Sequence, residues 1–255
     1  MFGYHNIYLF IIAVLPVFVL AYVVYRQDKC EKEPIGKLIK VFFLGALSII
    51  PAAIMEGMLT RFTPDLPVVS GAYTGFVVAG CSEELWKLLL LYWAIWKSAE
   101  FDEYFDGIVY ACFLSLGFAC FENLSYIFGQ QSFSDAMATG SVRAVLSVPG
   151  HFLFGVTMGY YFALAKFDQQ HRGKYLMLAF LVPMLLHGTF DSLLMIPESM
   201  GQGAELVTGV LFVLFIWFDV KMWKWGVRRI KHLQELSKKQ DADRSHPFKD
   251  FVWEW

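Results

Sequence analysis

The sequence predicts an all-α integral membrane protein, a bundle of about seven transmembrane helices with the N-terminus outside and the C-terminus in the cytoplasm. Three observations support this prediction: the composition, the length of the apolar runs, and the placement of Lys and Arg between them. The chain has 255 residues, of which 57% are hydrophobic and 17% are charged. A soluble domain carries about 25% charged residues. This composition argues strongly against a soluble two-domain protein.

Seven apolar runs are long enough to cross a membrane, because a hydrocarbon core about 30 Å thick needs roughly 20 residues of helix. In chain order they cover residues 7–25, 38–59, 69–96, 105–128, 142–167, 175–196 and 206–223. No Lys or Arg precedes the first run, and its apolar stretch is too long for a cleaved signal peptide. We therefore expect it to remain as a span.

The connectors between these runs predict the orientation, since cytoplasmic loops hold the excess of Lys and Arg. Basic residues lie after the first, third, fifth and seventh runs. On the other side Arg61 stands in a loop and Arg143 lies just inside the fifth run. The basic set is Arg26, Lys29, Lys32 and Lys37, then Lys97, then Lys166, Arg172 and Lys174, and finally Lys221, Lys224, Arg228, Arg229 and Lys231.

The chain divides into a polytopic transmembrane domain, residues 1–223, and a basic cytoplasmic tail, residues 224–255. Apolar residues alternate with the basic ones in this tail, which favours an interfacial helix on an anionic inner leaflet. The alternative is a solvated, partly helical extension of the last span. The net charge of −2 gives no reason to expect nucleic acid, and the four cysteines form no CxxC pair that would indicate a thiolate metal site.

Ionisable side chains inside the predicted spans indicate a functional site, because carboxylates and histidines are costly in lipid. We select eight polar residues within four of the runs as candidates for the site. They are Glu83, Glu84 and Lys87 in the third run, Glu122 and Asn123 in the fourth, His151 in the fifth, and His187 and Asp191 in the sixth.

Helical spacing groups some of these residues on common faces. Lys87 lies one turn after Glu83 and Glu84, so its ammonium can reach at least one of the two carboxylates. His187 and Asp191 are four residues apart, so Asp191 can orient the imidazole.

Depth in the membrane predicts that the four runs contribute to one site. At about 1.5 Å per residue from the outer end of each run, the paired glutamates lie roughly 20 Å deep, the two histidines roughly 14 Å, and Glu122 and Asp191 roughly 8 to 9 Å. We therefore expect an enclosed polar site that opens toward the outer leaflet.

Three kinds of chemistry fit two histidines and several carboxylates at such a place. The first is hydrolysis assisted by a metal such as zinc. The second is hydrolysis without metal, in which glutamate activates water and histidine or asparagine stabilises the oxyanion. The third is a proton or ion relay. Composition alone does not separate them, and any single pair, such as Glu83 with Lys87, could be a structural ion pair.

The order of motifs resembles the PrsW family of intramembrane proteases, which is related to the prenyl-CAAX endopeptidases and the bacteriocin-processing proteins. The resemblance covers approximately residues 25–195. Its motifs are Glu83-Glu84-Leu-Trp-Lys87 (EExxK), Phe118-Ala-Cys-Phe-Glu122-Asn123 after Asp106-Gly107 and Gly117, His151 after Arg143, His187-Gly-Thr-Phe-Asp191, and the acidic connector from Asp28 to Pro34.

The resemblance implies a multi-pass protease of the bacterial cell membrane, which hydrolyses a peptide bond of a membrane protein near the outer face. An anti-sigma factor is the best-known substrate of the family. The partners expected are this substrate and the lipid bilayer; the sequence predicts neither the cleavage site nor the oligomeric state.

The clustering of acids and histidines suggests roles for individual residues. Glu83 or Glu84 would act as general base on a water molecule. Lys87 would keep one of the two glutamates ionised, because adjacent carboxylates in a low dielectric resist double ionisation.

The remaining residues would hold the reactants. His151, His187 and Glu122 would hold the water or a Zn²⁺ ion. Asn123 would help to position the substrate carbonyl, and Asp191 would orient His187.

Two rival classes stay open at this point. A proton-coupled or ion-coupled transporter also needs intramembrane acids and histidines, but transporters commonly contain internal repeats and none stands out here. A non-catalytic membrane scaffold would keep polar pairs without needing the complete set. A seven-span receptor fits least, since it would not need acids and histidines at matched depth on four helices.

Overall fold

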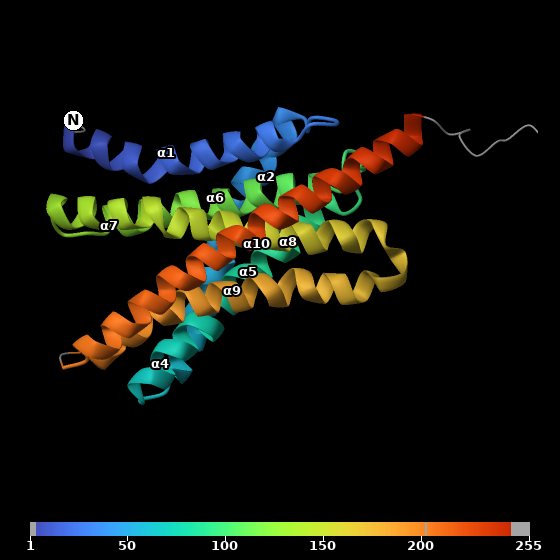
Figure 1. Cartoon of the computed structure of the whole chain (residues 1–255). Helices are drawn as coiled ribbons and strands as arrows, with labels where there is room; N and C mark the ends of the chain where they lie inside the picture. The colour runs from blue at the N-terminus through green and yellow to red at the C-terminus, as the bar shows by residue number, and fades with distance from the viewer. Residues whose placement is uncertain (1–3, 202, 246–255) are drawn as a thin grey trace, which may run out of the picture.

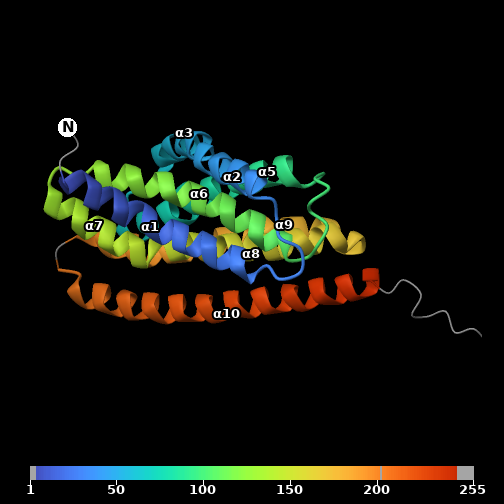
Figure 2. The same cartoon turned by 90° about the horizontal axis from the view of Figure 1, so that it is seen from above.

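A computed structural model describes residues 4–201 and 203–245, and all regular structure in these ranges is helical. Figures 1 and 2 show an elongated bundle in which α10 runs along one side and α3 lies on the opposite side. The elements are α1 (Tyr4–Gln27), α2 (Ile35–Leu47), α3 (Ile49–Leu59), η1 (Thr60–Phe62), α4 (Pro67–Tyr73), η2 (Thr74–Cys81), α5 (Ser82–Ile95), α6 (Asp106–Phe128), α7 (Phe133–Val145), α8 (Ser147–Phe167), η3 (Gln169–His171), α9 (Arg172–Met200) and α10 (Glu205–Ser245).

The helices confirm the predicted all-α membrane architecture. Among the described residues, six helical stretches are long and apolar enough to cross a membrane: His5–Gln27, Ile35–Phe62, Asp106–Phe128, Phe133–Phe167, Gln169–Met200 and Glu205–Arg244. The third predicted run, residues 69–96, forms the unbroken helical path of α4, η2 and α5, and it carries the Glu83, Glu84 and Lys87 charges.

Large apolar side chains cover the outside of the bundle. Phe18 is 57% exposed on α1, and Val213 is 68% exposed on α10. Such a surface would be a liability in water, but it matches the acyl chains of a bilayer.

The centre of the bundle is α6, which packs against α2 on one side and α8 on the other through glycine. A Cβ atom at Gly45 of α2 would lie 1.8 Å from the Leu114 carbonyl oxygen of α6. One at Gly159 of α8 would lie 2.3 Å from the Gly107 carbonyl oxygen. Small residues thus let the helix backbones touch, as in other membrane bundles, and they fix the height of the α6 side chains relative to both neighbours.

The fifth predicted run, residues 142–167, is divided between two helices. The division is at Leu146, a turn residue whose φ of −111° lies well away from the usual helical value near −63°. Pro149 stands in the first turn of α8, where its missing N–H costs no helical hydrogen bond. Arg143 therefore belongs to α7, and His151 to α8.

The predicted tail continues α10 without a break at Trp223, and α10 has 41 residues, about 61 Å of helix. Leu233 in this tail is fully buried, and Gln234 donates a hydrogen bond to the Gln27 carbonyl at 2.6 Å. Up to Ser245 the tail packs along the connector end of the bundle; residues 246–255 of the predicted tail lie outside the described residues.

The two ends of the bundle differ in the connectors they gather. In Figure 1 the described N-terminus of α1 lies at one end, and the α1–α2 connector, the α8–α9 turn and the last turn of α10 lie at the other. Lys166 of α8 donates to the Trp96 carbonyl at 2.7 Å, and Arg244 of α10 pairs with Asp102 at 2.9 Å. The basic connectors after α1, α5 and α8 thus share one end with the end of α10.

Candidate functional site

The two glutamates and the lysine of α5 form a buried ionic group. The Lys87 ammonium donates to Glu83 Oε2 at 3.0 Å and to Glu84 Oε1 at 2.8 Å. Lys87 and Glu84 are fully buried, and Glu83 is 5% exposed. The Lys87 Nζ atom also lies 4.0 Å from the centroid of the Phe118 ring, which adds a cation–π contact. The helical spacing predicts this group. In it the Lys87 ammonium lies between the two carboxylates.

A π-helical segment, η2, leads directly into α5 and brings it against α9. Its glycines allow the approach: a Cβ atom at Gly75 would lie 2.5 Å from Ser192 Oγ, and one at Gly188 would lie 2.2 Å from Phe76 Cδ1. π-helical turns are rare in proteins, and those that occur often lie at functional sites. The close packing places Glu83 and Glu84 beside His187 of α9.

His187 of α9 lies between two carboxylates. Its Nδ1 atom is 2.9 Å from Glu84 Oε1, and its Nε2 atom is 3.3 Å from Asp191 Oδ2. Phe154 of α8 stacks on the ring with a centroid distance of 4.6 Å. Both ring nitrogens can therefore donate to an acid, and the ring orientation is fixed from both sides.

His151 of α8 links the α5 group to α6. Its Nδ1 atom accepts from Lys87 Nζ at 3.3 Å, and its Nε2 atom lies 2.7 Å from Glu122 Oε2. Ser115 of α6 donates to the His151 carbonyl oxygen at 2.7 Å. The neighbours thus favour the tautomer that carries its proton on Nε2, with Nδ1 free to accept.

Arg143 of α7 is a site residue that the sequence reasoning did not include. Its Nη2 atom lies 2.7 Å from Glu122 Oε2, and its Nε atom donates to Asn123 Oδ1 at 2.7 Å. Asn123 is fully buried and donates to the Ala13 carbonyl of α1 at 3.2 Å. An arginine inside an apolar run is the signal that identifies such a residue, because its charge in lipid needs a partner.

These side chains surround one cavity with a volume of about 650 Å³, which is within the usual size range of binding pockets. Of the eight predicted site residues, Glu83, Glu122, His151, His187 and Asp191 line it, whereas Glu84, Lys87 and Asn123 do not. Residues from α3, η2, α5, α6, α7, α8 and α9 complete the wall, including Glu56, Thr74, Ser125, Tyr126, Arg143, Ser147, Phe154 and Glu198.

Four side chains of the site have the donor set of a metal centre. One ligand atom each from Glu83, Glu84, His151 and His187 lies within 4.8 Å of the other three. The Glu84 Oε2 atom is buried and has no hydrogen-bond partner. Imidazole nitrogens and carboxylate oxygens suit zinc. The sequence predicts Glu122, His151 and His187 as metal ligands. The two histidines belong to the group of four, whereas Glu122 lies outside it and contacts His151.

Comparison with known proteins gives a consistent result. The family described as "PrsW family intramembrane metalloprotease" matches residues 33–219. A relative named Protease PrsW from Clostridioides difficile (strain 630) is 36% identical over 233 residues, which are 91% of this chain and 93% of the relative.

Two further relatives of the same name match over similar lengths. That of Geobacillus kaustophilus (strain HTA426) is 34% identical over 216 residues, or 85% of this chain and 88% of the relative. That of Bacillus subtilis (strain 168) is 33% identical over 218 residues, or 85% and 91%. No solved structure matches the chain.

Proposed function

The chain belongs to the PrsW family of intramembrane metalloproteases, and on this basis we propose that the cavity between α5, α6, α8 and α9 hydrolyses a peptide bond of a membrane-protein substrate. One observation carries the proposal: carboxylates and histidines from α5, α6, α8 and α9 line a single cavity of about 650 Å³. An extended peptide segment needs such a space beside its catalytic groups.

Glu83 is the general base in this proposal. Its carboxylate lines the cavity, whereas Glu84 is fully buried behind it and is held by Lys87 and His187. A base must reach the water molecule that it deprotonates, so the cavity-facing glutamate is the better placed of the two. The Lys87 ammonium, 3.0 Å from Glu83 Oε2, favours the ionised carboxylate that this role requires.

The groups on α6 and α7 position the histidine of α8. Arg143 holds Glu122, and Glu122 holds His151 at Nε2. We assign Asn123 to the same chain of contacts, because its side chain binds Arg143 and α1 rather than lining the cavity. Asp191 positions His187 by its 3.3 Å contact.

A metal ion fits the same residues. Glu83, Glu84, His151 and His187 would hold it, with the free Glu84 Oε2 atom as one ligand. When bound, zinc polarises the scissile carbonyl and makes a bound water molecule a stronger nucleophile. In the present arrangement the Lys87 ammonium supplies the positive charge among these carboxylates. A bound ion would take its place at His151 Nδ1, because Glu122 holds the Nε2 atom.

The proposal includes the side of the membrane. The basic connectors share one end of the bundle, and assigning this end to the cytoplasm follows the positive-inside rule. The N-terminus then lies outside, and cleavage takes place in the outer half of the membrane. The substrate class is a membrane protein such as an anti-sigma factor.

The experiment compares Glu83→Gln, Glu84→Gln and a matched control, Glu205→Gln, in cells that co-express a tagged membrane substrate. Glu205 is exposed at the start of α10. We expect Glu83→Gln to abolish cleavage at an unchanged protein level, because an amide cannot accept the proton. We expect Glu84→Gln to reduce both cleavage and accumulation, because the neutral amide leaves Lys87 and His187 without the negative charge that they share. Glu205→Gln should cleave normally.

The proposal fails if Glu83→Gln and Glu84→Gln both retain full activity. Proton or ion flux through purified wild-type protein in liposomes, without any cleavage, would favour the transporter class instead. Elemental analysis of the same purified variants adds a second readout, since zinc should be lost in His151→Ala and His187→Ala.

A further inference from the structure

A second group of buried carboxylates lies at the other end of α6. It consists of Asp28 in the α1–α2 connector, Glu103 in the α5–α6 connector and Asp106, the first residue of α6. The three residues are 1% to 3% exposed, and one oxygen atom from each lies within 4.8 Å of the others. Asp106 and Glu122 are sixteen residues apart on α6, about 24 Å along the helix. The group is therefore separate from the cavity described above.

The hydrogen bonds around this acid group leave several of its oxygen atoms without a partner. Asp106 Oδ2 accepts from the backbone N–H of Asp102 at 3.1 Å and of Glu103 at 2.6 Å, but its Oδ1 atom is buried and unpartnered. Both oxygens of Asp28 and the Oε2 atom of Glu103 are also buried and unpartnered. Unpaired buried carboxylate oxygens are costly, so their accumulation at one place needs an explanation.

Two of the positive side chains nearby are engaged elsewhere, and two more, Lys29 and Lys238, line the adjacent pocket without an ion pair to the three carboxylates. Lys32 donates to the carbonyl oxygens of Tyr25 and Asp28, both at 2.8 Å, and Arg244 pairs with Asp102. In the part of the chain that the structure describes, none of the three carboxylates forms an ion pair. Three negative charges can share such a site only if a cation or protons neutralise them.

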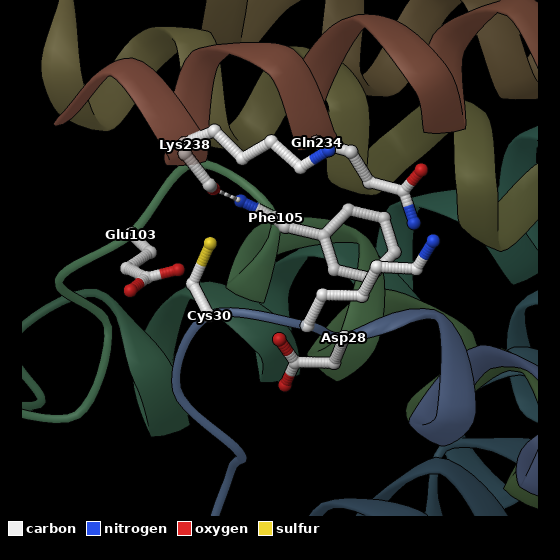
Figure 3. A pocket seen from close by; sticks show the side chains of 8 residues that line it. Asp28, Cys30, Glu103, Phe105, Gln234 and Lys238 are labelled. Carbon is white, nitrogen blue, oxygen red and sulfur yellow. Dashed lines mark hydrogen bonds between the residues drawn. The ribbon is translucent and has the colours of Figure 1, made fainter. Parts of the chain in front are cut away.

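A small pocket lies beside the acid group. It has a volume of about 10 Å³ and is lined by Asp28, Cys30, Glu103 and Lys238 among others, a size that suits one water molecule or ion. Figure 3 shows Asp28, Cys30 and Glu103 next to this pocket, with Gln234 and Lys238 of α10 across from them.

We propose that Asp28, Glu103 and Asp106 bind a hard divalent cation, Mg²⁺ or Ca²⁺. All three ligands are carboxylates, and oxygen ligands are those that both ions prefer, with water completing the coordination. The ion would join the α1–α2 connector, the α5–α6 connector and the N-terminus of α6. It would also neutralise the negative charges of the three carboxylates, which come from three separate segments.

The test measures the thermal unfolding midpoint of the full chain, purified in detergent and freed of metal with EDTA at pH 7.5. Adding MgCl₂ or CaCl₂ at about 100 times its dissociation constant should raise the midpoint by roughly 5 °C or more. Asp28→Asn should remove this response and should raise the midpoint in EDTA, because it removes one of three repelling charges. Glu103→Gln serves as the second variant and should lose the response in the same way.

The matched control is Asp102→Asn, which alters a neighbouring carboxylate that is 43% exposed and pairs with Arg244. This variant should keep the full response. Ions bound among Glu83, Glu84 and the histidines contribute equally to all these proteins, so the difference between variants isolates the acid group. The proposal is overturned if neither ion shifts the wild-type midpoint, or if Asp28→Asn and Glu103→Gln respond as the wild type does.

Discussion

Buried carboxylates gather near the two ends of α6 in opposite electrostatic settings. At the cavity end, Glu83 and Glu84 share the Lys87 ammonium, and Glu122 contacts Arg143. At the connector end, Asp28, Glu103 and Asp106 have no ion pair among the described residues and leave buried oxygens unpartnered. The same residue types are thus neutralised by the protein at one end and left to an external partner at the other.

This difference teaches how the chain keeps acids inside an apolar bundle. Removing one member of a buried ion pair leaves the other charge uncompensated, which typically costs about 3 to 5 kcal/mol. The cavity end should therefore be sensitive to losing a cationic side chain. The connector end should be sensitive to divalent cations and protons in solution.

The largest effect is expected for Lys87→Met, which keeps the volume of the side chain and removes its charge. Glu83 and Glu84 would remain buried without their shared donor, so we expect a loss of about 3 to 5 kcal/mol in the free energy of unfolding. Denaturant unfolding of the purified protein in detergent measures this loss. Lys97→Met is the matched control, because Lys97 is exposed in the connector after α5.

A triple variant sharpens the same prediction. Combining Lys87→Met with Glu83→Gln and Glu84→Gln removes the uncompensated charges and should recover part of the lost stability. If Lys87→Met is no less stable than Lys97→Met, the cavity end is not balanced by Lys87, and the contrast between the two ends fails.

A smaller effect is expected where α7 borders the cavity. Arg143→Gln removes the contact with Glu122 and the hydrogen bond to Asn123. Hydrogen bonds to charged groups contribute about 1.5 to 3 kcal/mol, so cleavage should slow by roughly 10-fold to 100-fold if this support is needed in the transition state. Arg143→Lys should retain part of the rate, and Arg61→Gln, an exposed arginine, should retain all of it. Equal rates for Arg143→Gln and the wild type would show that Glu122 holds His151 without help.

The sequence predicts the contacts that lie within one helix better than those between helices. Spacing along the chain is enough to place Lys87 beside Glu83 and Glu84, and Asp191 beside His187, because a helix repeats every 3.6 residues. The Arg143 contact with Glu122 joins α6 to α7, and spacing along one helix does not predict it.

The acid group at the connector end illustrates the same limit. Asp28, Glu103 and Asp106 belong to three segments, and their oxygens meet only in the folded bundle. The counted depths also separate Glu84 and His187 by about 6 Å, whereas their side chains meet at 2.9 Å. Counting residues along a helix predicts the depth of a residue in the membrane only coarsely, because helix tilt and π-helical turns alter this depth.

The smallest effect is expected from pH at the connector end. Burial raises the pKa of Asp28 from 3.8 to about 6 and the pKa of Glu103 from 4.5 to about 7. Burial likewise raises the pKa of Glu33, which accepts from the Tyr110 hydroxyl, to about 7. These pKa values are higher in the folded chain than in the unfolded chain. Their stabilising contribution is therefore complete below about pH 4 and is lost as the pH rises through 6 and 7.

In EDTA the wild-type unfolding midpoint should consequently fall between pH 5 and pH 8, and Asp28→Asn should fall less because one of the titrating groups is gone. Millimolar Mg²⁺ or Ca²⁺ should restore the midpoint at pH 8 and do little at pH 5, since protons then occupy the same oxygens.

The other charged and titratable groups that face the acid group are Cys30, Glu31 and Lys32 in the α1–α2 connector, Lys37 of α2, Asp102 in the α5–α6 connector, and Lys238, Asp241 and Arg244 of α10. They are common to both proteins, so the difference between the two pH profiles reports on Asp28. Parallel profiles would show that the acids at this end are compensated as fully as those around Lys87, and the contrast between the two ends of α6 would disappear.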